Sequence, residues 1–191
     1  MTRKPIFSIL LPWFLASGVA EAQVRQIDAA NSTVKVHVSR AGVLSAFGHD
    51  HEIAAPIASG TVDAGAQRVE LHINATAMKV TDPGASDKDR AEIQSTMLGP
   101  EVLDSNQYRE IIFRSTSAER QSEEKWRVTG NLTLHGQNRP VVVEATGQGG
   151  HYAGTARIRQ KEFGIKPVKI AGGTVRVKDE LQIDLDIRLL P

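Results

Sequence analysis

The chain contains no cysteine among its 191 residues. No disulfide can hold the protein together, no thiol can act as a nucleophile, and no cysteine is available for a lipid anchor. The sequence also lacks a Gly-x-Ser-x-Gly turn and a glycine-rich phosphate loop. Stability must therefore come from the burial of apolar side chains, and the common catalytic patterns are missing.

Long apolar runs are scarce as well. The clearest run, at positions 6–15, is about half of the roughly 20 residues that span a bilayer, and Pro12 interrupts it. Arg3 and Lys4 precede it, and Ala-Glu-Ala at 20–22 follows it, a pattern typical of a secretory signal peptide. We predict a leader at 1–22 that is cleaved, one domain at 23–191 that does not span the membrane, and a periplasmic location.

Charge of one sign is not in excess. Removing 1–22 takes two basic and one acidic residue from the 23 basic and 22 acidic residues of the chain, which leaves 21 of each. A neutral chain without a basic run gives no electrostatic reason to expect nucleic acid or an anionic membrane as the main partner.

Period-two alternation dominates what is present. Apolar residues alternate with polar ones at Val34, Val36 and Val38, and again over 69–73 and 181–189. Such alternation places one face of a strand in an apolar interior and the other in water. Further strands are predicted near 61–62, 109–115, 125–134, 141–145, 152–159 and 174–178.

One stretch breaks this period. Ser86 is a suitable N-cap with an acidic residue three positions later, and Gly99-Pro100 would end a helix. We predict a helix over 87–98. The fold class is then all-β, an antiparallel lipocalin-like barrel of about eight strands with one short inserted helix near the barrel mouth.

Several segments, taken in order and spacing, are similar to those of a known family. One of them is Val-Thr-Gly-Asn-Leu-Thr-Leu-His-Gly at 128–136, and the others are at 27–34, 102–104, 108–116 and 162–165. Together they resemble the YceI-like family of periplasmic polyisoprenoid- or lipid-binding proteins. The resemblance implies an antiparallel barrel that holds an amphiphilic molecule with a long apolar tail, and it implies no catalysis and no cofactor. Where many members have a basic residue before a Pro-Asp-Phe-Phe-Asp stretch, this chain has Thr96-Met97-Leu98. A neutral or carboxylate-headed lipid is therefore favoured over a pyrophosphate.

Strand parity gives a predicted lining. If Val34 points inward, so do the residues of the same phase on the other strands, with a few side chains nearer the mouth or helix. The predicted ligand contacts are Val36, Val38, Phe47, Leu71, Ile73, Met78, Met97, Ile111, Phe113, Leu132, Leu134 and Phe163. The same pattern is compatible with an ordinary packed core.

The histidines support a competing hypothesis. His49 and His51 would face the same way in a strand, and a hairpin closed symmetrically around Leu44 would place His37 opposite His51. Three imidazoles with an open position describe a hydrolytic zinc site. The His-Glu-x-x-His pattern is absent, however.

The sequence therefore favours a carrier of an isoprenoid or fatty-acyl lipid that is not an enzyme. A metal-binding or metal-dependent enzyme centred on His49 and His51 is the alternative, and an accessory protein of an envelope membrane complex is a third class. The identity of the ligand and a homodimer are left open.

Overall fold

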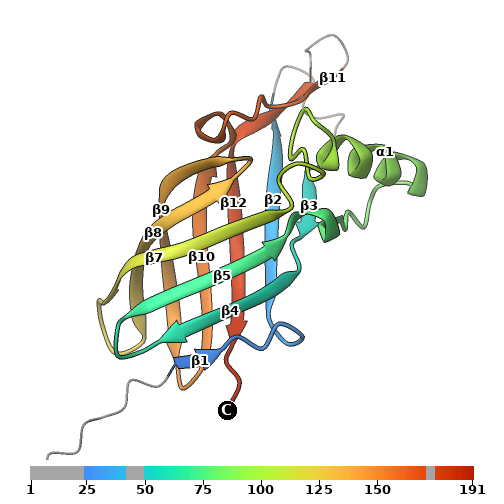
Figure 1. The fold of residues 1–191 in the computed structure, drawn as a ribbon. Helices are drawn as coiled ribbons and strands as arrows, with labels where there is room; N and C mark the ends of the chain where they lie inside the picture. The colour runs from blue at the N-terminus through green and yellow to red at the C-terminus, as the bar shows by residue number, and fades with distance from the viewer. Residues whose placement is uncertain (1–23, 42–49, 171–174) are drawn as a thin grey trace, which may run out of the picture.

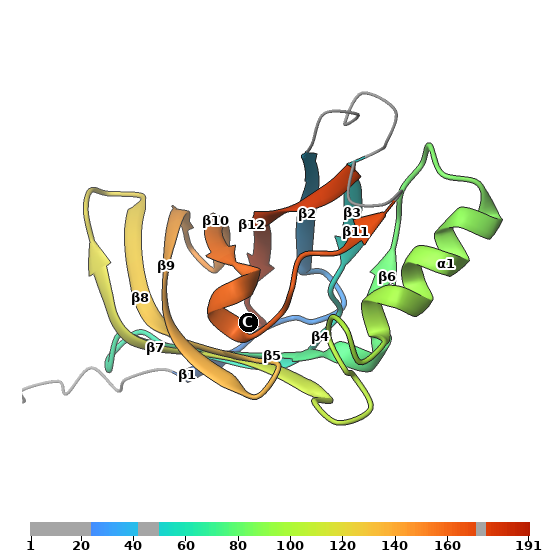
Figure 2. The same ribbon diagram turned by 90° about the horizontal axis from the view of Figure 1, so that it is seen from above.

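The computed structural model describes residues 24–41, 50–170 and 175–191. Within these ranges the chain forms one antiparallel sheet that curls around an interior, with one α-helix outside it (Figure 1; Figure 2). Eleven strands follow one another across the sheet in the order β1-β4-β5-β7-β8-β9-β10-β12-β2-β3-β6, and β11 pairs with β12 off this path. The interior of the curl is where the apolar faces of the strands meet.

The strands differ widely in length. The long ones are β2 (Thr33–Ala41), β4 (Ile57–Asp63), β5 (Arg68–Asn74), β7 (Glu110–Arg120), β8 (Lys125–Leu134), β9 (Gln137–Gln148), β10 (His151–Arg159) and β12 (Val175–Arg188). The short ones are β1 (Val24–Gln26), β3 (His51–Ala54), β6 (Lys79–Val80) and β11 (Lys169–Ile170). Two short 3-10 helices, η2 (Ala75–Ala77) and η3 (Gln160–Phe163), follow β5 and β10.

The predicted all-β, antiparallel class with a single short α-helix is confirmed for the described residues. The lipocalin-like barrel of about eight strands is corrected to a curled sheet with more strands, because β1 and β6, the two ends of the strand order, do not pair with each other in the part of the chain that is described. Strands of two or three residues are too short to show an alternating pattern, so β1, β6 and β11 could not be predicted from periodicity.

The end of β12 returns to the segment that follows β1. Ile27 forms an isolated antiparallel bridge with Leu189. The Asp28 N–H donates to the carbonyl of Arg188 (2.8 Å), and the Leu190 N–H donates to the carbonyl of Gln26 (2.8 Å). These hydrogen bonds hold the curl together at the lower end in Figure 1, near the C-terminus.

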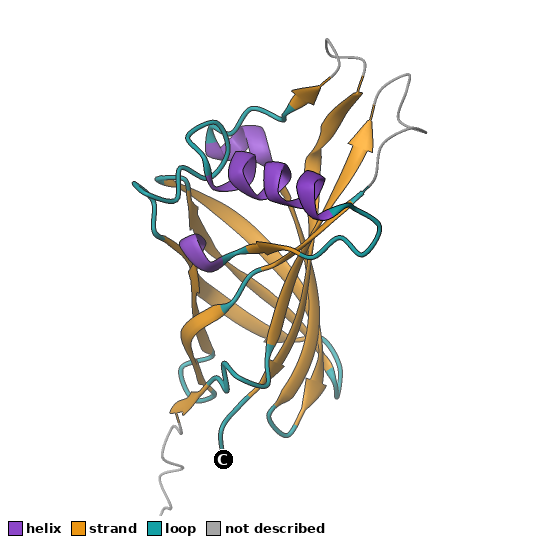
Figure 3. Ribbon diagram, turned by 90° about the vertical axis from the view of Figure 1, so that its right-hand side faces the viewer, coloured by secondary structure: helices purple, strands orange, loops and turns teal. Residues whose placement is uncertain are grey.

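The helix α1 (Asp87–Leu98) begins and ends at the predicted residues. The Ser86 side chain accepts a hydrogen bond from the Asp89 N–H, as an N-cap does. Gln94 accepts from the Val80 N–H and donates to the Met78 carbonyl (2.8 Å each), so the helix is tied to strand β6 at the sheet edge (Figure 3). No helix in the described ranges is long and apolar enough to cross a bilayer.

The two predicted strands near 174–178 and 181–189 form one strand, β12. Val177 pairs with Arg40 and Leu181 pairs with Val38, so β12 has two more residues than β2 between these pairs. An even number of extra residues keeps the alternation in phase. Val177 lines the interior on one side of the irregular stretch, and Leu181, Ile183, Leu185 and Ile187 line it on the other. Gln160 donates a hydrogen bond to the Lys178 carbonyl (2.8 Å) in the irregular stretch.

Candidate ligand-binding cavity

The curl of the sheet encloses a cavity of about 680 Å³. This volume lies within the range of roughly 300–1,000 Å³ that is usual for small-molecule sites in proteins. Side chains from β2, β5, β7, β8, β9, β10 and β12 form the wall, and α1 contributes at one end. The interior face of the sheet is therefore not completely filled by its own side chains.

Most of the predicted contacts lie on this wall. Parity alone placed most of them on the interior face. The structure brings together residues from four strands, from α1 and from the position after η2, all distant in sequence. The predicted residues that line the cavity are Val36, Val38, Leu71, Ile73, Met78, Met97, Ile111, Phe113, Leu132 and Leu134. Whether they touch a ligand stays a prediction.

Two predicted contacts are not among these lining residues, one because it packs elsewhere and one because it is not described. Phe163 is fully buried, with 0% of its surface exposed, and it packs in the core instead of lining the cavity. Phe163 is the last residue of η3, and Gly164 follows it in a left-handed conformation (φ 75°). This turn directs the ring of Phe163 into the core. Phe47 lies outside the described residues.

Part of the wall was not predicted. Strands β9 and β10 contribute Ala145, Gly154 and Ala156, whose small side chains leave interior space that larger ones would occupy. Trp126 lines the end of the cavity opposite α1, and its Nε1–H donates to the Gly147 carbonyl (3.1 Å). The alternation of small residues on β10 was the signal in the sequence for this hollow.

The register of β2 and β3 corrects the arrangement of histidines expected from the sequence. Val38 pairs with His51, and His37 pairs with Glu52, one residue away from the assumed symmetric hairpin. A shift of one residue moves every side chain to the other face of the sheet. His51 therefore lies on the cavity wall, whereas His37 lies on the outer face, with its Nε2 2.9 Å from Asp184 Oδ2.

The histidines that the structure describes do not converge on one point. Among the described residues, no group of three histidine or carboxylate side chains is arranged to hold a metal ion. His49 lies outside the described residues, so a site that uses it stays a prediction. His72 and His151 each pair with a carboxylate, Glu70 and Asp186 respectively.

His51 has a buried acidic partner. Its Nδ1 is 2.5 Å from Oδ2 of Asp82, a residue with 2% of its surface exposed. The other carboxylate oxygen, Oδ1, accepts the Glu52 N–H (2.6 Å). When Asp82 is ionised its oxygens only accept hydrogen bonds, and Nδ1 of His51 is then the donor. Asp82 precedes Pro83-Gly84 in a turn, and nothing in the sequence indicates that it meets His51.

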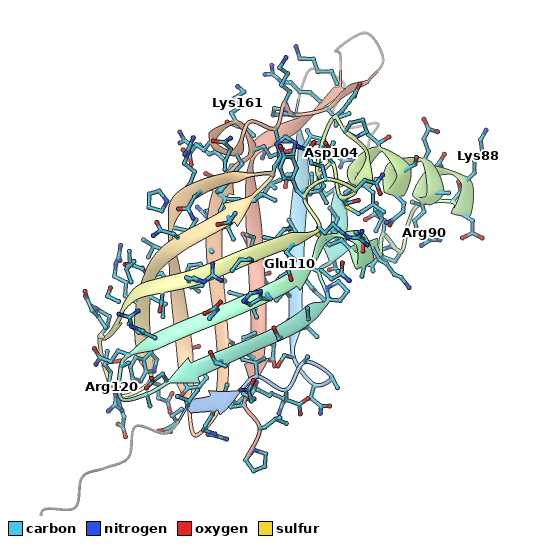
Figure 4. All side chains as sticks on the ribbon, in the orientation of Figure 1. Lys88, Arg90, Asp104, Glu110, Arg120 and Lys161 are labelled. Carbon is cyan, nitrogen blue, oxygen red and sulfur yellow. The ribbon has the colours of Figure 1, made fainter. Side chains whose placement is uncertain are left out.

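The outer face carries exposed ionic contacts. Glu70 Oε1 is 2.7 Å from His72 Nε2 and 2.8 Å from Arg114 Nη2. Hydrogen bonds from His72 and then from Arg114 lower the pKa of Glu70. Glu110, on β7, lies 4.0 Å from His72 Nδ1 (Figure 4). In the same way, the Lys35 ammonium lowers the pKa of Glu52 on the outer face of β3.

The fold and the cavity together define an all-β protein whose single curled antiparallel sheet surrounds an apolar interior. The chain belongs to the YceI-like domain family, which matches residues 26–189. This match covers all but the ends of the described chain and agrees with the resemblance found in the sequence.

Two curated relatives are each named as a UPF0312 protein. One from Vibrio cholerae is 30% identical over 113 residues, which cover 54% of this chain and 58% of that protein. Another, from Shewanella sp. strain MR-7, is 23% identical over 177 residues, or 86% of this chain and 88% of that protein. The match therefore spans only a little over half the length of the Vibrio relative.

Solved structures share the fold. Burkholderia cenocepacia BcnA aligns over 84% of this chain and 98% of its own, with a TM-score of 0.63 and 21% sequence identity. The Campylobacter jejuni YCEI protein aligns over 73% of this chain and 81% of its own, with a TM-score of 0.51 and 13% identity. At these identities the likeness concerns the fold alone.

Proposed function

We propose that the protein binds a long-chain isoprenoid or another amphiphilic lipid in the cavity and acts as its carrier. The observation that carries this proposal is the apolar space of about 680 Å³ inside the curled sheet. Aliphatic and aromatic side chains such as Leu71, Phe113 and Ile183 line its middle, and charged residues line its ends. Such a wall suits an extended apolar chain whose polar group lies at one end.

The expected energy is sufficient for binding. Burial of a methylene group contributes about 0.8 kcal/mol, so a tail of ten carbons gains roughly 8 kcal/mol before the cost of association. No strong polar contact is needed along the middle of the wall. We also propose that the protein binds its ligand without catalysis, because the charged side chains of the cavity wall are confined to its ends.

We further propose that the protein works in the periplasm. The support is the leader pattern at 1–22, which lies outside the described residues, together with family membership. A carrier that holds the tail of a lipid away from water would allow that lipid to cross an aqueous compartment.

A matched pair of substitutions tests the carrier function. Val36 lies on the cavity wall, whereas the neighbouring Lys35 is exposed on the outer face. We expect the larger side chain of Val36→Trp to fill part of the cavity. The affinity for a fluorescent fatty acid should fall by about tenfold or more, which corresponds to about two methylene groups of the ligand that are no longer buried. Lys35→Trp should leave uptake unchanged.

Thermal unfolding of the same variants separates a cavity from a packed core. A new ring placed in empty space should leave the melting temperature of Val36→Trp close to that of the wild type. A ring forced into a packed core costs about 1–3 kcal/mol of unfolding free energy. A clear loss of stability with unchanged lipid uptake would count against the proposed function.

A further inference from the structure

The two ends of the cavity differ in their charged side chains. At the end formed by the β4–β5 turn, Asp63 and Arg68 line the cavity, and Arg68 is exposed. At the end next to α1, Arg40 and His51 line it from β2 and β3. Figure 1 shows that the β4–β5 turn and α1 lie at opposite ends of the sheet. A lipid with one polar group would therefore meet a different environment in each orientation.

The imidazole of His51 is held in place by its surroundings. Asp82 is buried, and its carboxylate is bonded to both His51 Nδ1 and the Glu52 N–H. The Arg90 guanidinium in turn donates to the Asp82 carbonyl (2.8 Å), which connects this loop to α1. With Nδ1 bonded to Asp82, Nε2 is the ring nitrogen that remains for a molecule in the cavity.

Arg40 provides a second donor at the same end. It follows Val38 on the interior face of β2, and 33% of its side chain is exposed. Its Nε is 3.7 Å from Asp50 Oδ1, while the Arg40 N–H donates to the same oxygen (3.0 Å). A guanidinium presents two parallel N–H groups that match the two oxygens of a carboxylate.

The other charged residues of this end set the charge it accepts. Arg176 from β12 is exposed, as are Asp89 and Glu92 from α1. Asp50 lies beside Arg40 and Asp82 beside His51, so the described side chains of this end carry no excess of positive charge. Such an end suits one negative charge better than the two of a phosphate monoester. The partly buried groups, Arg40 and His51, interact more strongly than the exposed acids, which water screens.

Building on the proposed carrier function, we propose that the α1 end of the cavity binds the carboxylate head group of a long-chain acid. His51 Nε2 and the Arg40 guanidinium contact the carboxylate, and Asp82 is a positioning residue that acts through His51. The tail extends along the apolar wall toward Trp126 at the other end.

The test compares three ligands with the same tail. Purified protein, stripped of bound lipid with detergent, is titrated with dodecanoate, dodecanol and dodecyl phosphate below their micelle-forming concentrations, and the fluorescence of Trp126 reports the tail. We expect the carboxylate to bind about tenfold more tightly than the alcohol, the effect of one charge-assisted interaction. Phosphate binding tighter than carboxylate would overturn the carboxylate assignment.

Substitutions identify the end that binds the head group. His51→Gln and Arg40→Gln should each weaken dodecanoate binding about tenfold, and Arg40→Lys should restore part of the loss. The loss for dodecanol should be much smaller, because its neutral hydroxyl gains no charge-assisted hydrogen bond. Retained dodecanol binding also shows that the variant is folded. Arg68→Gln, at the opposite end, is the matched control and should change neither ligand.

The outcomes separate the two proposals. If none of the three ligands binds the wild type, the carrier function fails, and the head-group site fails with it. If dodecanol binds and the carboxylate gains nothing over it, only the head-group site fails. If Arg68→Gln loses dodecanoate binding while His51→Gln and Arg40→Gln keep it, the carboxylate lies at the β4–β5 end of the cavity. That result would also overturn the head-group site at the α1 end.

Discussion

Two histidine–aspartate pairs involve strand β2 or its neighbour β3, on opposite faces of the sheet. On the inner face, His51 and Asp82 have 22% and 3% of their side chains exposed. On the outer face, His37 and Asp184 have 37% and 40% exposed, and their atoms are 2.9 Å apart. The same two residue types thus form one pair at the cavity wall and one pair in water.

The difference shows how strongly the surroundings determine the role of a pair. An exposed ion pair contributes little to stability, because water and salt screen it. A buried carboxylate must have hydrogen-bond partners, and losing them leaves polar groups without water or protein to bond. The inner pair is therefore expected to fix local structure and orient His51, whereas the outer pair is expected to do neither.

The largest expected effect comes from removing the buried acid. Asp82→Ala leaves the Glu52 N–H and His51 Nδ1 without their partner. We expect a loss of about 2–4 kcal/mol in the free energy of unfolding, measured by urea denaturation. Asp184→Ala, the outer counterpart, should lose at most about 0.5 kcal/mol. Equal losses in the two variants would contradict the distinction between the faces.

The smallest expected effect concerns Glu70 on the outer face. Its pKa is lowered by hydrogen bonds from His72 and Arg114, so the stabilisation is present above the pKa of the unfolded carboxyl and is lost as the pH falls through the folded pKa. Because 39% of its side chain is exposed, Glu70→Gln should cost at most about 0.5 kcal/mol at pH 7.

Melting temperatures across a pH series test this prediction. The difference between wild type and Glu70→Gln should be present at neutral pH, should shrink as the pH falls below the pKa of the unfolded carboxyl, and should disappear once the pH lies below the lowered pKa of the folded state. A difference that persists unchanged in acid would mean that the carboxylate charge is not its cause. A difference of several kcal/mol would mean that this face is not screened by water.

Much of the fold could be predicted from alternation and capping. The period-two pattern in 181–189 and 69–73 identified the interior face correctly, because burial on one face of a strand requires that pattern. Ser86 and Gly99 marked the helix ends, because the unsatisfied backbone groups there need such residues. The strand count could not be obtained, since the shortest strands are held by neighbours and carry no pattern of their own.

The polar part of the site could not be predicted. Periodicity indicates which residues share a face along one strand, but the register between two strands depends on the loop that joins them. The assumed symmetric hairpin was wrong by one residue. It placed His37 and His51 on the same face of the sheet, whereas the structure places them on opposite faces. Asp82 reaches His51 only through the tertiary fold, 31 positions along the chain.

The central claim is that the cavity holds an apolar chain, and native mass spectrometry of the purified protein tests it most directly. The same sample is extracted with organic solvent and analysed for metals. The account predicts a lipid-sized adduct close to one per protein, released by extraction and independent of any metal. A protein that repeatedly comes out lipid-free, and that takes up no prenyl or acyl chain after detergent stripping, would contradict it.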